Sequence, residues 1–129
     1  MFWAFPKGRA FRYIFLQKSK KDVTSIANAH FIENLQDSIT SALEKVDGKA
    51  TFKEDVWKRA EGGGGKTRVI ENGNIFEKGG VNISKVFGEL PEALRKQFGV
   101  EEGNFFACGL SLVLHPKNPF VPTVHANWR

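Results

Sequence analysis

Five polar side chains near the end of the chain are of types that transfer protons and hold carboxylates. Two histidines, His115 and His125, stand on either side of a proline-rich segment, with Ser111, Asn127 and Arg129 close to them in sequence. Imidazole moves protons near neutral pH, and a guanidinium grips a carboxylate through two parallel hydrogen bonds. A hydroxyl and an amide can orient what is bound. The set therefore suits acid–base chemistry on an anionic substrate.

These residues reach one surface only if two strands place them there. Side chains alternate between the two faces of a strand. In "LSLVLH" the leucines take one face and leave Ser111 and His115 on the other, and in "VHANWR" the alternation groups His125, Asn127 and Arg129. If the two segments pair across the proline loop with their apolar sides together, all five polar residues share a face. An ordinary solvated sheet face with the same residue types is the alternative that parity leaves open.

A metal site is a second interpretation of the histidine pair. Ten residues separate His115 from His125, and no His, Cys or carboxylate follows in the sequence. Further ligands would therefore have to come from elsewhere in the protein. The third histidine, His30, lies beside the apolar stripe of a predicted helix, where a solvated or packing role is expected.

The surrounding pattern favours an α+β fold with a largely antiparallel sheet. Apolar residues recur at three- and four-residue steps from Phe31 to Val46, which predicts an amphipathic helix. We expect Thr24 or Ser25 to cap its start and Gly48 to end it. A short helix is predicted over "PEALRKQF", residues 91–98. Strands are predicted over residues 52–59, 66–70, 74–78, 81–87, 105–115 and 124–129.

The run "EGGGGKT" has the ending of a phosphate-binding loop without its context. The pattern G-x-x-x-x-G-K-[ST] needs a glycine where Ala60 stands. The preceding segment is too charged for a central parallel strand, and the following one predicts a β-hairpin at Asn72-Gly73 in place of a helix. The glycines therefore indicate close backbone approach or positive φ.

Charge divides the chain into two parts. The net charge is +5 over 129 residues, but residues 1–21 contain six bases and no acid. Aromatic residues alternate with these bases, so a binding module for nucleic acid or an anionic membrane surface is the alternative function. A transit peptide and an extension unrelated to the fold are further interpretations, and the extension is favoured. We accordingly expect no nucleic-acid partner and no stable membrane insertion. The single Cys108 excludes an internal disulfide.

Three longer motifs identify a family. "EGGGG", "ENGNIFEKGGVN" and "HPKNPFVPTVHANWR", in that order, resemble oxygen-dependent coproporphyrinogen III oxidases, and the likeness runs from about Ala29 to Arg129. The resemblance implies oxidative decarboxylation of coproporphyrinogen III to protoporphyrinogen IX in haem biosynthesis. O₂ is the co-substrate, and CO₂ and hydrogen peroxide are the other products. A cytoplasmic homodimer is implied as well, built on a broad, flat antiparallel sheet with helices on both sides.

The resemblance also assigns roles. His125 matches the family's proposed proton donor, and His115 with His125 matches histidines proposed to bind a divalent metal in some bacterial members. Substrate contacts are implied for Ser111, Asn127, Trp128 and Arg129. Because residues 1–21 match nothing in the family, we divide the chain into a leader over 1–21 and an N-terminal part of the oxidase domain over 22–129. The family's chains are much longer, so we expect this portion to be inactive alone.

Overall fold

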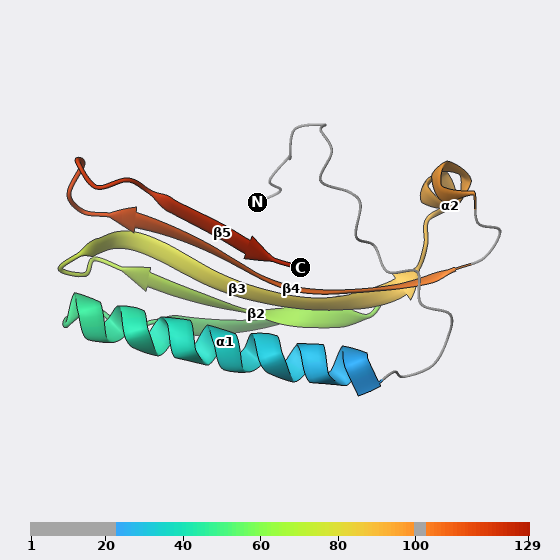
Figure 1. Ribbon diagram of the computed structural model, residues 1–129, viewed down its shortest axis with the longest axis horizontal. Coiled ribbons are helices and arrows are strands. Elements are labelled where there is room, and N and C mark those ends of the chain that lie inside the picture. Colours follow the sequence, from blue (N-terminus) through green and yellow to red (C-terminus); the bar gives the residue numbers. More distant parts are fainter. Residues whose placement is uncertain (1–22, 100–102) are drawn as a thin grey trace.

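The computed structural model describes residues 23–99 and 103–129 as an antiparallel five-stranded sheet with one long helix along it (Figure 1). The strands are neighbours in sequence order, β1-β2-β3-β4-β5. This confirms the α+β class. The elements are α1 (Val23–Asp47), β1 (Lys53–Lys58), β2 (Gly63–Glu71), β3 (Phe76–Glu89), α2 (Glu92–Phe98), β4 (Asn104–Pro116) and β5 (Val124–Trp128).

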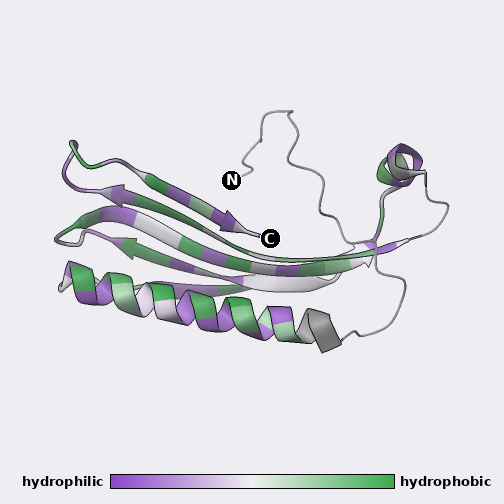
Figure 2. Cartoon of the chain, viewed as in Figure 1, coloured by the Kyte–Doolittle hydropathy of each residue, from purple (hydrophilic) through white to green (hydrophobic). Residues whose placement is uncertain are grey.

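The helix α1 lies on one face of the sheet because its apolar stripe is buried there. Ile32 is buried, and Leu35, Ile39 and Leu43 pack against the same cluster from the helix. Apolar and polar residues alternate along both the helix and the strands (Figure 2). The sheet contributes Ile70, Phe76, Val81, Ile83, Leu110, Leu112 and Leu114 to this core.

The ends of α1 differ from the prediction. The helix already begins at Val23, so Thr24 and Ser25 lie inside it and the predicted cap is wrong. Phe31 and Val46, the ends of the predicted stripe, are 61% and 59% exposed. Their neighbours Ile32 and Asp47 are buried, and successive residues of a helix are turned by about 100°, so Phe31 and Val46 point away from the sheet. Gly48 follows the helix with φ 70, as expected of a helix stop.

Two predicted strands are in fact one. Residues 76–78 of the first predicted segment and all of 81–87 belong to the single strand β3, which continues through the pair Gly79-Gly80. A Cβ on Gly79 would stand 2.9 Å from Leu114 Cδ2 and 3.1 Å from Ile70 Cγ2. The glycine therefore lets neighbouring side chains pack closely over the strand, and it does not end the strand.

The glycine run forms a turn and the beginning of β2. Gly62 and Gly63 take φ 123 and φ 84, which favours glycine at both positions. The indole of Trp57 lies over Gly65, where a Cβ would stand 2.7 Å from Trp57 Cε2. Lys66 continues the strand and no helix follows, so the structure excludes the phosphate-loop interpretation. Most of the run, from Gly63 onward, belongs to β2.

The hairpin at Asn72-Gly73 is confirmed, and a helix residue holds it. Asn72 takes φ 56, and its N–H donates to Glu77 O at 3.0 Å. The Asp47 carboxylate at the end of α1 accepts hydrogen bonds from the hairpin N–H groups of residues 74, 75 and 76, at 3.0, 3.0 and 3.1 Å. It also accepts one from Ala50 at 2.9 Å. The buried side chain thereby ties the helix to the β2–β3 turn.

The short helix α2 begins directly after Pro91 and ends at Gly99, whose φ is 66, as predicted. Figure 1 shows α2 beyond the end of the sheet, between β3 and β4. Within residues 23–99 and 103–129, neither helix has the length and apolar character needed to cross a membrane. The basic leader over 1–21 lies outside the described residues.

Candidate active site on the far face of the sheet

Cross-strand pairing brings the predicted site residues together on the face of the sheet away from α1, called here the far face. Ser111 of β4 pairs with Asn127 of β5, and Val113 pairs with His125. Directly opposed residues in an antiparallel pair point to the same face. The intervening leucines of β4 are buried on the α1 side. The predicted parity is therefore confirmed for Ser111, His125 and Asn127.

Arg129 follows β5 and reaches the same surface. A Cβ on Gly109, two residues before Ser111, would lie 3.2 Å from Arg129 Cγ. Gly109 and Ser111 point to the same face because two residues separate equivalent positions on a strand. The stem of Arg129 therefore crosses the far face at Gly109, beside Ser111.

His115 lies at the end of the same face. It pairs with Lys78 of β3, in a shallow depression that Glu71, Asn72 and Glu77 also line. His125 faces Val113, two residues before His115, so the two histidines are diagonal neighbours on adjacent strands. Such neighbours are about 7–8 Å apart. The structure thus places both histidines on one surface, with an acidic and basic rim around His115.

Trp128 differs from the other predicted substrate contacts. It pairs with Leu110, which is buried against α1, so the indole lies on the α1 side of the sheet and is 45% exposed. The structure therefore brings together Ser111, Asn127 and Arg129 with both histidines on the far face. Trp128 lies on the opposite face of the sheet. Its contact with substrate stays a prediction.

The charged groups of this face are partly paired, since Lys78 Nζ lies 3.1 Å from Glu71 Oε1 beside His115. Across residues 23–99 and 103–129, no side-chain hydrogen bond or ion pair engages His125 or Arg129. Both are exposed. An imidazole and a guanidinium that stay unpaired on one surface can bind an anion and move a proton without breaking an internal contact.

Metal ligands are sparse on this face. Among the described residues, no three His, Cys, Asp or Glu side chains stand close enough to hold a metal ion together. His115 and His125 would supply at most two ligands. A metal would then need donors from outside the described residues.

Further polar residues belong to this face, and sequence reasoning missed the two that continue the line from Ser111 across β3 and β2. Thr67 of β2 pairs with Asn82 of β3, and Asn82 pairs with Ser111. Together with Asn127 they form a row of four polar side chains, called here the polar row. The alternation of the apolar Val81 and Ile83 with polar residues in "VNIS" indicates that Asn82 lies on the polar face. The sequence pattern does not tell which strands are its neighbours.

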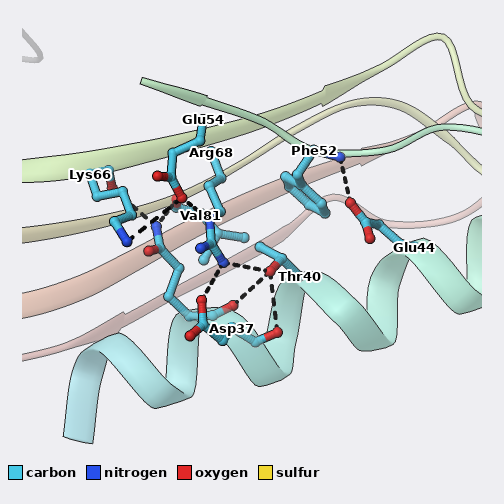
Figure 3. Close-up of polar contacts among 9 residues, drawn as sticks. Asp37, Thr40, Glu44, Phe52, Glu54, Lys66, Arg68 and Val81 are labelled. Carbon is cyan, nitrogen blue, oxygen red and sulfur yellow. Dashed lines mark hydrogen bonds and ion pairs between the residues drawn. The ribbon is translucent and has the colours of Figure 1, made fainter. Parts of the chain in front are cut away.

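The other face carries its own polar network, which is internally paired (Figure 3). Arg68 Nη1 lies 2.7 Å from Asp37 Oδ1, and Arg68 Nε donates to Glu54 Oε2 at 2.8 Å. Arg68 also donates to Thr40 Oγ1 at 3.0 Å. Burial would lower the pKa of Arg68, but hydrogen bonds to Glu54 and Asp37 outweigh it and raise that pKa. The network fixes α1 on β1 and β2.

Gln36 completes this support from the helix. Its side chain is fully buried, and Nε2 donates to the backbone oxygens of Lys66 at 3.0 Å and Val81 at 2.9 Å. Those two residues immediately precede Thr67 and Asn82. The side chain of Gln36 therefore fixes the backbone of β2 and β3 next to Thr67 and Asn82. These two residues are half of the polar row and lie on the opposite face of the sheet.

The fold and this face define an α+β protein with an exposed acid–base surface suited to carboxylates. A family model described as Coproporphyrinogen III oxidase matches residues 27–129. The chain belongs to the coproporphyrinogen III oxidase family.

Named relatives agree with that assignment. An oxygen-dependent coproporphyrinogen-III oxidase of Prochlorococcus marinus subsp. pastoris is 58% identical over 97 residues, which are 74% of this chain and 28% of the relative. The enzyme of the same name from strain MIT 9515 is 57% identical over 97 residues, again 74% and 28% of the two chains. That from strain SARG is 52% identical over 101 residues, 77% and 29%. The chain thus spans less than a third of these relatives.

Proposed function

We propose that this chain supplies a substrate-binding and proton-transferring face of an oxygen-dependent coproporphyrinogen III oxidase. One observation carries the proposal: Ser111, His125, Asn127 and Arg129 lie together on the far face. The substrate is a tetrapyrrole with four pyrrole N–H donors and four propionate carboxylates. An unpaired guanidinium, a hydroxyl, an amide and an imidazole are the complementary groups.

Each decarboxylation balances with O₂ as the oxidant. A propionate carboxylate loses CO₂ from its end and a hydride equivalent from its β-carbon, which leaves a vinyl group. The two electrons and that hydrogen, with one proton, reduce O₂ to hydrogen peroxide. We assign the proton transfer to His125, because its imidazole is exposed on the far face. Arg129 holds a propionate, and Ser111 and Asn127 orient the macrocycle.

The proposal extends to features that the family resemblance implies. These are homodimeric assembly, a cytoplasmic location and a further contact from Trp128. A divalent metal bound by His115 and His125 would supply Lewis-acid chemistry, but two ligands do not make a site.

A chimera tests the proposal. Residues 27–129 of this chain replace the matching segment of the Prochlorococcus marinus subsp. pastoris enzyme, to give what is called here the chimeric enzyme. We expect it to convert coproporphyrinogen III to protoporphyrinogen IX, measured by porphyrin fluorescence after oxidation and by peroxide release. The unmodified relative is the positive control. A chimeric enzyme that folds, by circular dichroism and thermal melting, but produces no vinyl product would contradict the proposal.

A further inference from the structure

The polar row extends across four strands, which makes it wider than the set of predicted site residues. Thr67, Asn82, Ser111 and Asn127 follow one another in register on β2, β3, β4 and β5. Three inter-strand gaps of about 4.8 Å give the row a length of about 14 Å. That length is comparable with a tetrapyrrole macrocycle, so a ligand centred at Ser111 would also cover Asn82.

Asn82 carries an acceptor that the described chain does not use. Its Oδ1 is buried and has no hydrogen-bond partner within residues 23–99 and 103–129. A buried polar atom without a partner is costly and uncommon. Thr67 and Ser111 stand on either side of Asn82, yet neither satisfies its Oδ1. The missing partner is therefore expected from a molecule that covers the far face.

The glycine beside Asn82 leaves room for such a molecule. Gly80 lies two residues earlier on the same face, and a Cβ placed there would be 3.9 Å from Asn82 Nδ2. Asn82 as a residue is only partly buried. Its amide is a broad two-fold rotor about χ2, so a half-turn exchanges the two groups and brings Oδ1 to the edge beside Gly80.

The backbone at Asn82 is fixed, which suits a contact residue. The buried Gln36 donates to the carbonyl oxygen of Val81, immediately before Asn82, at 2.9 Å. Only the side-chain amide is left to turn. A rigid backbone with one free rotor reduces the ordering cost of binding.

We propose that Asn82 is a further substrate-contacting residue, whose Oδ1 accepts a hydrogen bond from a pyrrole N–H of the porphyrinogen. The inference rests on the proposed function, which supplies the ligand. The four N–H groups of a porphyrinogen are donors, while its carboxylates lie at the periphery. In this arrangement Arg129 binds a carboxylate at the periphery, and Asn82 binds a pyrrole N–H at the centre of the ring.

The experiment compares Asn82→Leu with the unsubstituted chimeric enzyme. Leucine has a similar size and removes both amide groups. We expect KM for coproporphyrinogen III to rise about five- to tenfold, the effect of one lost hydrogen bond. We expect the Tm to be unchanged or higher, because an unsatisfied buried oxygen is removed. Asn34→Leu on the exposed side of α1 is the matched control, with KM unchanged.

The possible results separate this inference from the proposed function. A raised KM without a fall in Tm supports a substrate contact. An unchanged KM in an active chimeric enzyme overturns the inference and leaves the proposed function standing. A raised KM accompanied by a Tm several degrees lower means that Asn82 is structural, which also overturns it. If Asn82→Leu does not fold, Asn82→Ala is read by the same criteria. An inactive unsubstituted chimera counts against both.

Discussion

On the α1 side of the sheet, the buried charged groups have partners within the chain, whereas on the far face, within the described residues, His125 and Arg129 are left without one and only the rim pair Lys78–Glu71 is joined. Arg68 contacts Asp37 and Glu54, and Asp47 accepts hydrogen bonds from the β2–β3 turn. His125 and Arg129, on the other side of the same strands, have no side-chain partner among the described residues. Both faces contain charged and amide groups, so residue type alone does not distinguish them.

The difference separates groups that hold the helix on the sheet from groups that remain open to a ligand. A polar group that is satisfied internally contributes to stability and is unavailable to a ligand. An exposed group without an internal partner keeps its hydrogen bonds to water and stays available to a ligand. Substitutions on the α1 side should therefore change stability, and substitutions on the far face should change binding and turnover.

The strongest test is His125→Ala in the chimeric enzyme. We expect kcat to fall by about 10²–10⁴, the usual contribution of a positioned acid or base, with KM and Tm little changed. Steady-state kinetics with porphyrin and peroxide detection measures it. His30→Ala is the matched control, since His30 is exposed on α1 and its Nδ1 lies 3.9 Å from Glu33 Oε2. A kcat within about threefold of the parent would remove the proton role from His125.

Asp47→Asn should cause the largest loss of stability on the α1 side. Hydrogen bonds from Ala50 and from the β2–β3 turn keep the pKa of Asp47 well below its ordinary value of 3.8, despite burial, which acts to raise it. A carboxyl whose pKa is lowered by folding stabilises the protein above its unfolded pKa. That contribution is lost as pH falls through the folded pKa.

We therefore expect Asp47→Asn to lower the Tm by more than about 5 °C at pH 7. The difference in Tm between parent and variant should become steadily smaller as the pH is lowered below 3.8. Thermal unfolding of the 129-residue chain at several pH values, followed by circular dichroism, measures this. Asp55→Asn, at an exposed position of β1, is the control and should leave stability unchanged. A Tm difference of the same size at every pH would show that the charge of the Asp47 carboxylate does not hold the β2–β3 turn.

Arg129→Ala should affect binding and spare stability. The loss of a charge-assisted contact of roughly 1.5–3 kcal/mol corresponds to a KM about 10- to 150-fold higher, with a smaller change in kcat. Arg59→Ala is the control, because Arg59 pairs with Glu61 at the β1–β2 turn, away from the polar row. An unchanged KM, or a fall in Tm equal to that of Asp47→Asn, would place Arg129 with the paired groups of the α1 side.

Sequence reasoning recovered the far face well because alternation on strands is strict. The apolar residues of β4 and β5 fix which side is buried, and that fixes the side for Ser111, His125 and Asn127 without knowledge of the rest. Asn82 needed one more fact, the order of the strands, which local pattern does not contain.

The α1 side was much less accessible to prediction. Its apolar stripe gave the helix but did not reveal that the polar Gln36 and Thr40 are buried in it. Burial of a polar side chain depends on partners such as Val81 O, which lies 45 residues away in sequence from Gln36. The wrong prediction of a break within β3 has a similar cause. Glycine weakens a strand locally, but pairing with β2 and β4 on both sides keeps Gly79 and Gly80 in the strand.

The adjacent glycines of β3 offer the finest test of the two faces, because one substitution can be made on each side of a single strand. Gly79 points to the α1 side, where a Cβ would stand 2.9 Å from Leu114 Cδ2. Gly79→Ala should therefore cost roughly 1–3 kcal/mol of unfolding free energy through overpacking. Gly80 points to the far face, where the nearest heavy atoms to a Cβ lie at 3.9 Å.

Gly80→Ala should accordingly leave the unfolding free energy within about 0.5 kcal/mol of the parent. The added methyl group would stand where a bound macrocycle crosses the polar row, so KM in the chimeric enzyme should rise about two- to fivefold, as for a small steric obstacle. Denaturant unfolding gives the unfolding free energy of each variant, and steady-state kinetics gives the KM of each. If Gly80→Ala destabilises as much as Gly79→Ala, the far face is packed against something within the protein. The unpaired groups of that face would then belong to an internal contact rather than to a ligand surface.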